Sequence, residues 1–109
     1  MTVTEHTEVP FVVTTDMKHG RLALALSGEL DLACSDLLRR DVHESDASIS
    51  DVTLDIAQLD FIDTAGVRAL LDVRTRHLAR GRSVQLLNPT ALVRKVVTLY
   101  GRPDLLTTS

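Results

Sequence analysis

Hydrophobic and polar residues alternate in four stretches of the chain, as they do in strands that bury one face. The clearest stretch covers residues 21–28, where Leu22, Leu24 and Leu26 point to one side and small residues point to the other. The remaining three stretches cover residues 11–15, 51–57 and 83–87. Residues 16–20 are turn formers between the first two stretches, so we expect these two strands to form a hairpin.

Three other stretches repeat their apolar residues at helical spacing, and they cover residues 34–45, 64–80 and 90–100. Ser35 and Asp36 suit the start of the first helix, and Gly81 suits the end of the second. The third helix carries two adjacent apolar stripes, which indicate either core or an interface, and core is the favoured interpretation. The stripes consist of Leu92, Val96 and Leu99 and of Val93, Val97 and Tyr100.

The order of the predicted elements is β-β-α-β-α-β-α, which is typical of an α/β fold with parallel crossovers. We therefore expect one domain over residues 9–109, with a central, mostly parallel mixed sheet and an N-terminal hairpin. Residues 1–8 show no periodicity, so we expect them to form a mobile tail.

The composition narrows the classes of function. A length of 109 residues suits a single domain, and a net charge of −3 does not favour nucleic acid as a partner. Cys34 is the only cysteine, which excludes an intramolecular disulfide and a zinc cluster. The four histidines share no metal-ligand spacing, so we expect no metal or cofactor and place these residues at the surface. They are His6, His19, His43 and His77.

The first residues are polar and acidic, unlike the basic and then apolar start of a signal peptide. No apolar run approaches the roughly 20 residues that a membrane span needs. We therefore expect a cytoplasmic protein without membrane contact.

The segment most suggestive of function covers residues 59–67, between a predicted strand and a predicted helix. Thr64 falls at the N-cap or in the first turn of that helix, where unpaired backbone N–H groups and the helix dipole favour an anion. Two interpretations remain open at this point: the hydroxyl only caps the helix, or it is also a surface site for modification. Gly66 is expected to leave the first turn open to the backbone of another protein.

Three blocks of the sequence resemble the STAS domain family (sulfate transporter and anti-sigma antagonist), particularly its stand-alone bacterial antagonists. Residues 26–32, Leu-Ser-Gly-Glu-Leu-Asp-Leu, are similar to the G-E-L-D segment that ends a strand in that family. Residues 61–66, Phe-Ile-Asp-Thr-Ala-Gly, resemble its phosphorylation loop, D-[ST]-[SA]-G. Residues 86–89, Leu-Leu-Asn-Pro, resemble the end of its last strand. The resemblance covers about residues 9–106.

The resemblance implies an anti-sigma factor antagonist that works by partner switching. In that family the unphosphorylated antagonist binds an anti-sigma factor, itself a serine/threonine kinase, and thereby frees a sigma factor. Phosphorylation releases the antagonist, and a PP2C-type phosphatase restores it. The resemblance makes Thr64 the acceptor, and Ala65 stands where many members have a second Ser. The residues expected to bind the partner are Glu29, Asp31, Asp60, Asp63, Thr64, Ala65, Gly66 and Arg68.

Two other functions are alternatives to partner switching. One is a non-switching STAS scaffold subunit of a lipid-transport ATPase or of a signalling assembly, in which Thr64 would only cap its helix. The other is a receiver domain with Asp55 as phosphate acceptor, which the sequence disfavours because the required acidic pair and Lys are not in place. No Gly-rich phosphate loop, Ser-His-Asp arrangement or pair of catalytic carboxylates stands out, so we do not expect an enzyme.

Overall fold

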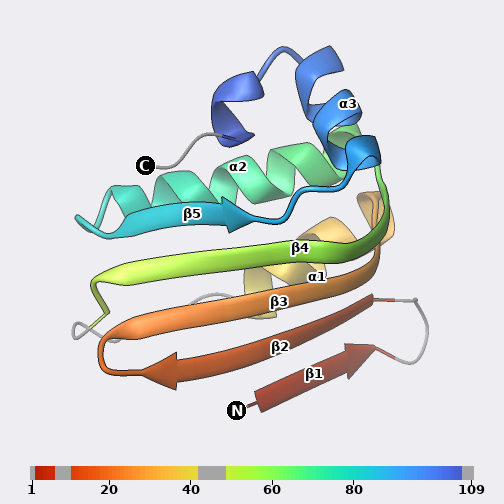
Figure 1. The fold of residues 1–109 in the computed structure, drawn as a ribbon. Helices are drawn as coiled ribbons and strands as arrows, with labels where there is room; N and C mark the ends of the chain where they lie inside the picture. The colour runs from red at the N-terminus through yellow and green to blue at the C-terminus, as the bar shows by residue number, and fades with distance from the viewer. Residues whose placement is uncertain (1, 7–10, 42–48, 107–109) are drawn as a thin grey trace.

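A computed structural model describes residues 2–6, 11–41 and 49–106 (Figure 1). Its five strands form one sheet in the order β1-β2-β3-β4-β5. The strands are β1 Thr2–His6, β2 Phe11–Lys18, β3 Arg21–Leu30, β4 Asp51–Ile62 and β5 Ser83–Leu87. The helices are α1 Leu32–Asp41, α2 Thr64–Leu78, α3 Ala91–Leu99 and the short 3₁₀ helix η1 Pro103–Leu106. The predicted α/β fold, with a mixed sheet and an N-terminal hairpin, is confirmed.

The first two strand pairings are antiparallel and the last two are parallel. The hairpin between β2 and β3 closes through a tighter turn than expected, because Lys18 still pairs with Arg21. Only His19 and Gly20 form the loop, with φ angles of 52° and 77°. Two consecutive positive φ angles match the twist of the flanking strands, which explains a glycine at the second position.

The expectation of a mobile tail over residues 1–8 is wrong for Thr2–His6, which forms β1 and pairs with β2 over its full length. Residues 1, 7 and 8 lie outside the described part of the chain. A single five-residue strand carries too little periodic signal to be recognised alone. This strand adds a second antiparallel pairing to the predicted sheet.

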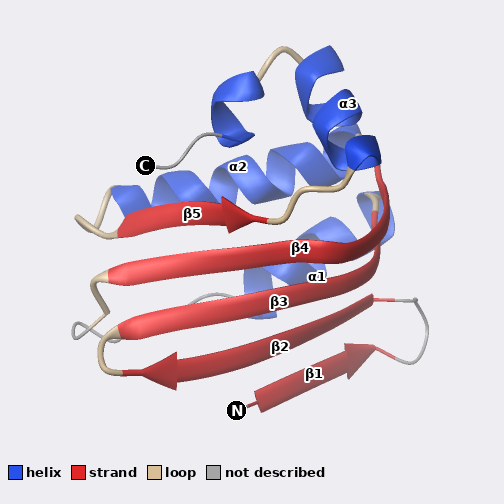
Figure 2. Ribbon diagram, viewed as in Figure 1, coloured by secondary structure: helices blue, strands red, loops and turns tan. Residues whose placement is uncertain are grey.

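Helices α1 and α2 cover one face of the sheet (Figure 2). On β3 the side chains that face these helices are buried, whereas Ala23 and Ala25 on the opposite face are exposed. The buried residues form a single aliphatic core with Phe11 as its aromatic member. The sheet is therefore half-buried, as an alternating pattern predicts.

The apolar stripes of α3 do not both reach the core. Val93 and Val97 are fully buried, but Leu92 is 41% and Leu99 is 77% exposed. The expectation that α3 buries its whole apolar surface is therefore wrong. Val96 and Tyr100 pack against the core but are only partly buried, so the helix leaves Leu92 and Leu99 in solvent.

Strand β4 is longer than the sequence predicts and reaches Ile62. It follows β3 in parallel through two register shifts, and Gly28 has a φ of 98° at the second of them. A bulge of this kind bends the strand and increases its local twist, and the pairing resumes beyond it. Asp60 and Phe61 consequently lie on the strand rather than in the expected loop over residues 58–63, and Asp63 alone joins β4 to α2.

Candidate functional site

The first turn of α2 is capped by Asp63. This residue has an extended backbone, and its Oδ1 accepts a hydrogen bond from the Gly66 N–H at 2.9 Å. Thr64 is the first residue of the helix and its side chain is exposed. The interpretation that Thr64 is present only to cap the helix is therefore wrong, since the neighbouring carboxylate does that work.

Removal of the Asp63 cap should destabilise the protein while removal of the Thr64 hydroxyl should not. We expect Asp63→Ala to lower the free energy of unfolding by about 1 kcal/mol, because an N–H of the first turn loses its acceptor. Asp63→Asn should restore most of that loss, and Thr64→Ala should change stability by less than about 0.5 kcal/mol. Urea denaturation followed by circular dichroism measures all three. A larger loss for Thr64→Ala than for Asp63→Ala would reverse the assignment of the cap.

Gly66 has a structural role that the sequence did not reveal. It is buried, and a Cβ placed on it would overlap the backbone carbonyl oxygen of Leu30 and lie 2.9 Å from Cγ1 of Ile62. The expectation that Gly66 opens the first turn to a partner's backbone is therefore wrong. The missing side chain lets α2 approach the end of β3, so the backbone that comes close belongs to the same chain.

Asp31 caps the other helix at this end of the sheet. Its Oδ1 accepts a hydrogen bond from the Cys34 N–H at 3.2 Å, and its carbonyl oxygen accepts one from the Ser35 N–H at 2.9 Å. Helix α1 therefore begins two residues before the predicted start at Cys34. Glu29 is exposed on β3 and pairs in register with Phe61 of β4. Its contact with a partner, like that of Asp31, stays a prediction.

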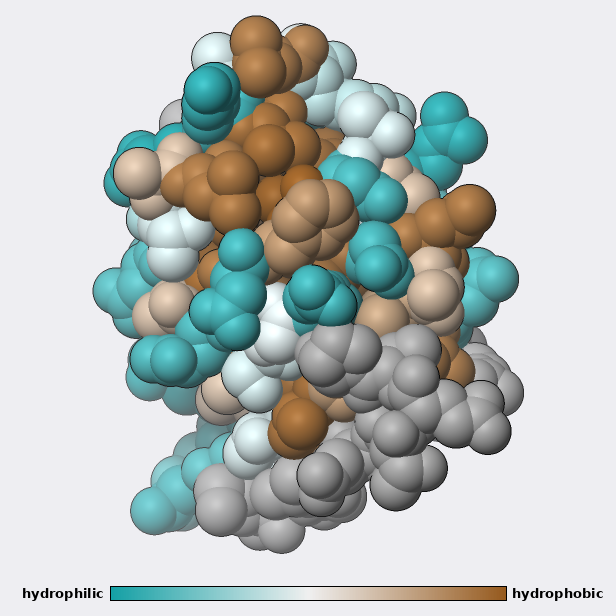
Figure 3. Space-filling view, turned by 90° about the vertical axis from the view of Figure 1, so that its right-hand side faces the viewer, coloured by the Kyte–Doolittle hydropathy of each residue, from teal (hydrophilic) through white to brown (hydrophobic). Residues whose placement is uncertain are grey.

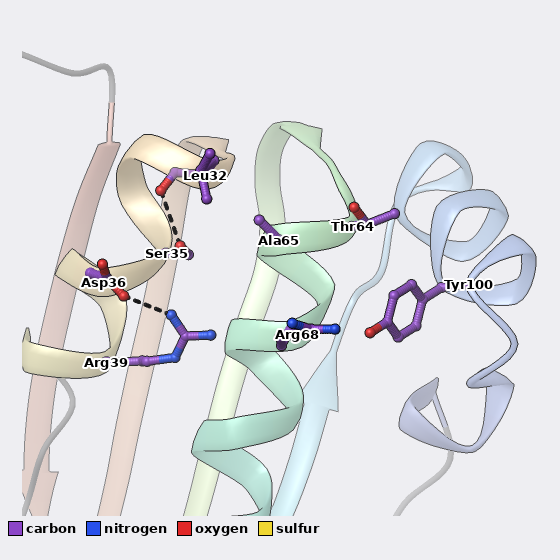
Figure 4. A pocket seen from close by; sticks show the side chains of 8 residues that line it. All are labelled: Leu32, Ser35, Asp36, Arg39, Thr64, Ala65, Arg68 and Tyr100. Atoms are coloured by element: carbon purple, nitrogen blue, oxygen red, sulfur yellow. Dashed lines mark hydrogen bonds and ion pairs between the residues drawn. The ribbon is translucent and has the colours of Figure 1, made fainter.

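A pocket of about 350 Å³ lies between α1, α2 and the end of α3 (Figure 4). It brings together Thr64, Ala65 and Arg68 from the predicted site with residues that the sequence did not single out for function. These are Leu32, Ser35, Asp36, Arg39 and Tyr100. The spacing of Thr64 and Arg68 on one helix could have indicated part of this set, but the position of Tyr100 depends on how α3 packs.

The two cations of the pocket have different surroundings. Arg39 bridges α1 and α2 through ion pairs of 2.9 Å to Asp36 and 2.8 Å to Asp72. The guanidinium group of Arg68 points toward the Tyr100 hydroxyl (Figure 4). Hydrogen bonding to that hydroxyl is the main cause that raises the pKa of Arg68. Arg68 is therefore a permanent cation one helical turn from Thr64.

Large apolar side chains are exposed around the same end of the sheet. Leu32, 75% exposed, lines the pocket with Thr64, and Phe61, 43% exposed, is the last residue but one of β4. Seen from the right-hand side of Figure 1, apolar side chains gather on the upper part of the molecule (Figure 3). Asp60 and Glu29 are also exposed here. The end of the sheet that presents Thr64 thus combines apolar and acidic groups, a composition suited to contact with another protein.

Cys34 and His77 are packing residues. Burial, followed by the charge of Asp31, raises the pKa of the Cys34 thiol, which disfavours the reactive thiolate. His77 is 2% exposed, and its Nδ1 lies 2.8 Å from Nη1 of Arg82, so its expected surface position is wrong. His19 is exposed as expected, whereas the side chains of His6 and His43 lie outside the described part of the structure.

Among the side chains that the structure describes, no group of three or more His, Cys, Asp or Glu could hold a metal ion. None of the helices described is both long and apolar enough to cross a membrane.

Comparison with protein families matches residues 13–107 to the family described as "Mlab, STAS domain". A comparison with curated proteins finds no match. The match to the family covers far more than half of the chain, and its limits enclose every residue of the pocket described above.

Solved structures with the same fold include two forms of one bacterial protein. The anti-sigma factor antagonist SpoIIAA in its unphosphorylated form has a TM-score of 0.70 and 22% identity, over 89% of this chain and 87% of that chain. The Bacillus cell fate determinant SpoIIAA in its phosphorylated form has a TM-score of 0.68 and 22% identity, over 89% and 90% of the two chains.

A murine transport protein contains the same fold as one part of a longer chain. The anion transporter Solute Carrier 26 family member A9 has a TM-score of 0.68 and 19% identity, over 77% of this chain but only 14% of that chain. At these identities the likenesses show the fold, which thus occurs both in an antagonist of similar length and within a transporter.

Proposed function

The chain belongs to the STAS domain family, and on that premise we propose that it is a cytoplasmic anti-sigma factor antagonist, not an enzyme, with Thr64 as its phosphate acceptor. In the unphosphorylated state it binds an anti-sigma factor that is a serine/threonine kinase, and a sigma factor is freed. Phosphorylation of Thr64 dissociates the complex. A PP2C-type phosphatase removes the phosphate and restores the form that binds the anti-sigma factor.

One observation carries the proposal. Thr64 is exposed at the start of α2, and its hydroxyl is not the cap of that helix because Asp63 supplies it. The hydroxyl can therefore receive a phosphoryl group without costing the helix its capping bond. A negative charge at this position also interacts favourably with the N-terminal end of the helix dipole. With Ala65 as the next residue, Thr64 is the only hydroxyl in the motif.

The surroundings of Thr64 support binding of a protein partner. Leu32 and Phe61 offer exposed apolar area, and Asp60 and Glu29 provide charges that can select the partner. The solved structures of SpoIIAA in phosphorylated and unphosphorylated forms give a precedent for such a cycle on this fold.

In the proposed transfer Oγ1 of Thr64 attacks the γ-phosphorus of ATP bound to the kinase. The bond from that phosphorus to the β,γ-bridging oxygen breaks, ADP leaves, and the hydroxyl proton passes to a base of the kinase. The antagonist contributes a positioned hydroxyl, and all nucleotide chemistry belongs to the partner.

The test is to incubate the protein with ATP and purified ATPase-type anti-sigma kinases from the same cell, and to map phosphate by mass spectrometry. We expect one phosphate at Thr64 in the wild type and none in Thr64→Ala. Thr64→Ser should accept at least as fast, because it lacks the β-methyl group next to the reacting oxygen.

The alternative is a non-switching STAS scaffold in a lipid-transport ATPase or a signalling assembly. It is supported by the presence of the same fold within a transporter. If no such kinase modifies Thr64, and affinity purification from the native cell recovers a transport complex instead, the antagonist proposal is wrong and the scaffold is favoured.

A further inference from the structure

Arg68 lies four residues after Thr64, and both side chains line the same pocket (Figure 4). Residues at this spacing are neighbours on the surface of a helix, with Cβ atoms about 5–6 Å apart. An acid that precedes a base by four residues is in the favourable orientation for a pair. A phosphate attached to Thr64 would therefore be formed within reach of a cation of its own chain.

Arg68 is suited to exchange the hydroxyl of Tyr100 for a phosphate as its hydrogen-bond acceptor. Arg39, the other cation of the pocket, is held by the carboxylates of Asp36 and Asp72. Arg68 instead faces the hydroxyl of Tyr100, which carries no charge in its protonated form. A hydrogen bond to a phosphate with close to two negative charges is considerably stronger than one to a neutral phenol.

We propose that a phosphate on Thr64 binds the chain's own Arg68 and draws it away from Tyr100. This step rests on the proposed function for the origin of the phosphate, and adds where the phosphate goes and which part of the fold responds. Tyr100 is the C-cap residue of α3, where its backbone N–H contacts the carbonyl oxygens of Val96 and Thr98. Phosphorylation therefore changes the contact between α2 and the end of α3 as well as the charge at Thr64.

Because Tyr100 caps α3, the exchange of acceptors by Arg68 also affects the end of that helix. The side chain of Tyr100 is half-buried and forms one wall of the pocket, so the loss of its contact with Arg68 alters that wall. Leu99, the residue before it, is exposed. A partner that covers both the pocket and this end of α3 would therefore contact two regions that phosphorylation changes. One is the phosphate on Thr64, and the other is the pocket wall formed by Tyr100.

The first test measures the phosphate. Phosphothreonine is installed at position 64 by genetic code expansion, so no kinase is needed, and the phosphate is titrated by ³¹P NMR. In the wild type we expect its second pKa to lie about half a unit below that in Arg68→Gln, because the guanidinium group stabilises the dianion. Arg76→Gln, which removes the same charge from an exposed position on the same helix, is the matched control and should match the wild type.

The second test measures Tyr100. The chain contains one tyrosine and no tryptophan, so its intrinsic fluorescence reports Tyr100 alone. We expect phosphothreonine to change the emission intensity of the wild type, and to leave that of Arg68→Gln unchanged. Equal phosphate pKa values in the wild type and Arg68→Gln would overturn the proposal, and so would an emission that does not respond to the phosphate. Failure of a kinase to modify Thr64 would contradict the proposed function and would leave both of these results unaffected.

Discussion

Gly66→Ala should destabilise the domain by about 2 kcal/mol or more, although alanine is the better helix former. In an exposed helix this substitution gains roughly 1 kcal/mol from helix propensity. Here the new methyl group would overlap the carbonyl oxygen of Leu30 and crowd Cγ1 of Ile62, at 2.9 Å. A backbone oxygen cannot rotate away as a side chain can, so α2 must move from β3, and overpacking of this kind costs 1–3 kcal/mol or more. Against the roughly 5–15 kcal/mol that stabilises a typical domain, the loss is large.

Gly81→Ala is the matched control for Gly66→Ala. Gly81 has a φ of 77°, and a Cβ on it would meet no atom within 4 Å. Alanine there costs only the strain of the left-handed backbone conformation, about 1 kcal/mol. Chemical denaturation of both variants should give the larger loss for Gly66→Ala. A Gly66→Ala protein as stable as the wild type would mean that the first turn of α2 is open, as the sequence alone had indicated.

The elements that the sequence predicted best are those whose signal is local. Strand β5 has its predicted bounds, Ser83–Leu87, and the N-cap and C-cap of α3 are the two ends of its predicted range. Both follow from alternation or helical spacing between strong turn formers. The position of Thr64 at the start of α2 was likewise available from the pattern.

The features that the sequence missed depend on contacts between distant segments. Strand β4 extends to Ile62 because β3 lies beside it, and the bulge near Gly28 that keeps the two in register has no signature in the sequence of β4. Gly66 could be a flexible, open position or a close-packed one, and only the location of Leu30 decides between them. The pairing of Arg68 with Tyr100 across the pocket is of the same kind.

Phosphothreonine at position 64 should lower the affinity for the anti-sigma kinase by at least about 100-fold, which is about 2.8 kcal/mol of binding free energy. The phosphate adds about −1.5 to −2 charges at pH 7. It would lie beside Leu32, which is 75% exposed in the isolated chain, and close in sequence to the exposed carboxylate of Asp60. Burial of that charge against apolar surface loses its hydration, and any acidic group of the partner adds repulsion.

The fold should survive the same modification, since the cap at Asp63 is untouched and the helix dipole and Arg68 both favour the added charge. We expect isothermal titration to show the loss of binding for the phosphorylated protein and a smaller loss for Thr64→Glu, which adds only one charge. Thr75→Glu is the control, because it adds that charge to an exposed position on the same helix, about 16 Å farther along it. It should bind as the wild type does. Equal losses for Thr64→Glu and Thr75→Glu would mean that overall charge controls binding and that Thr64 holds no special place in the interface.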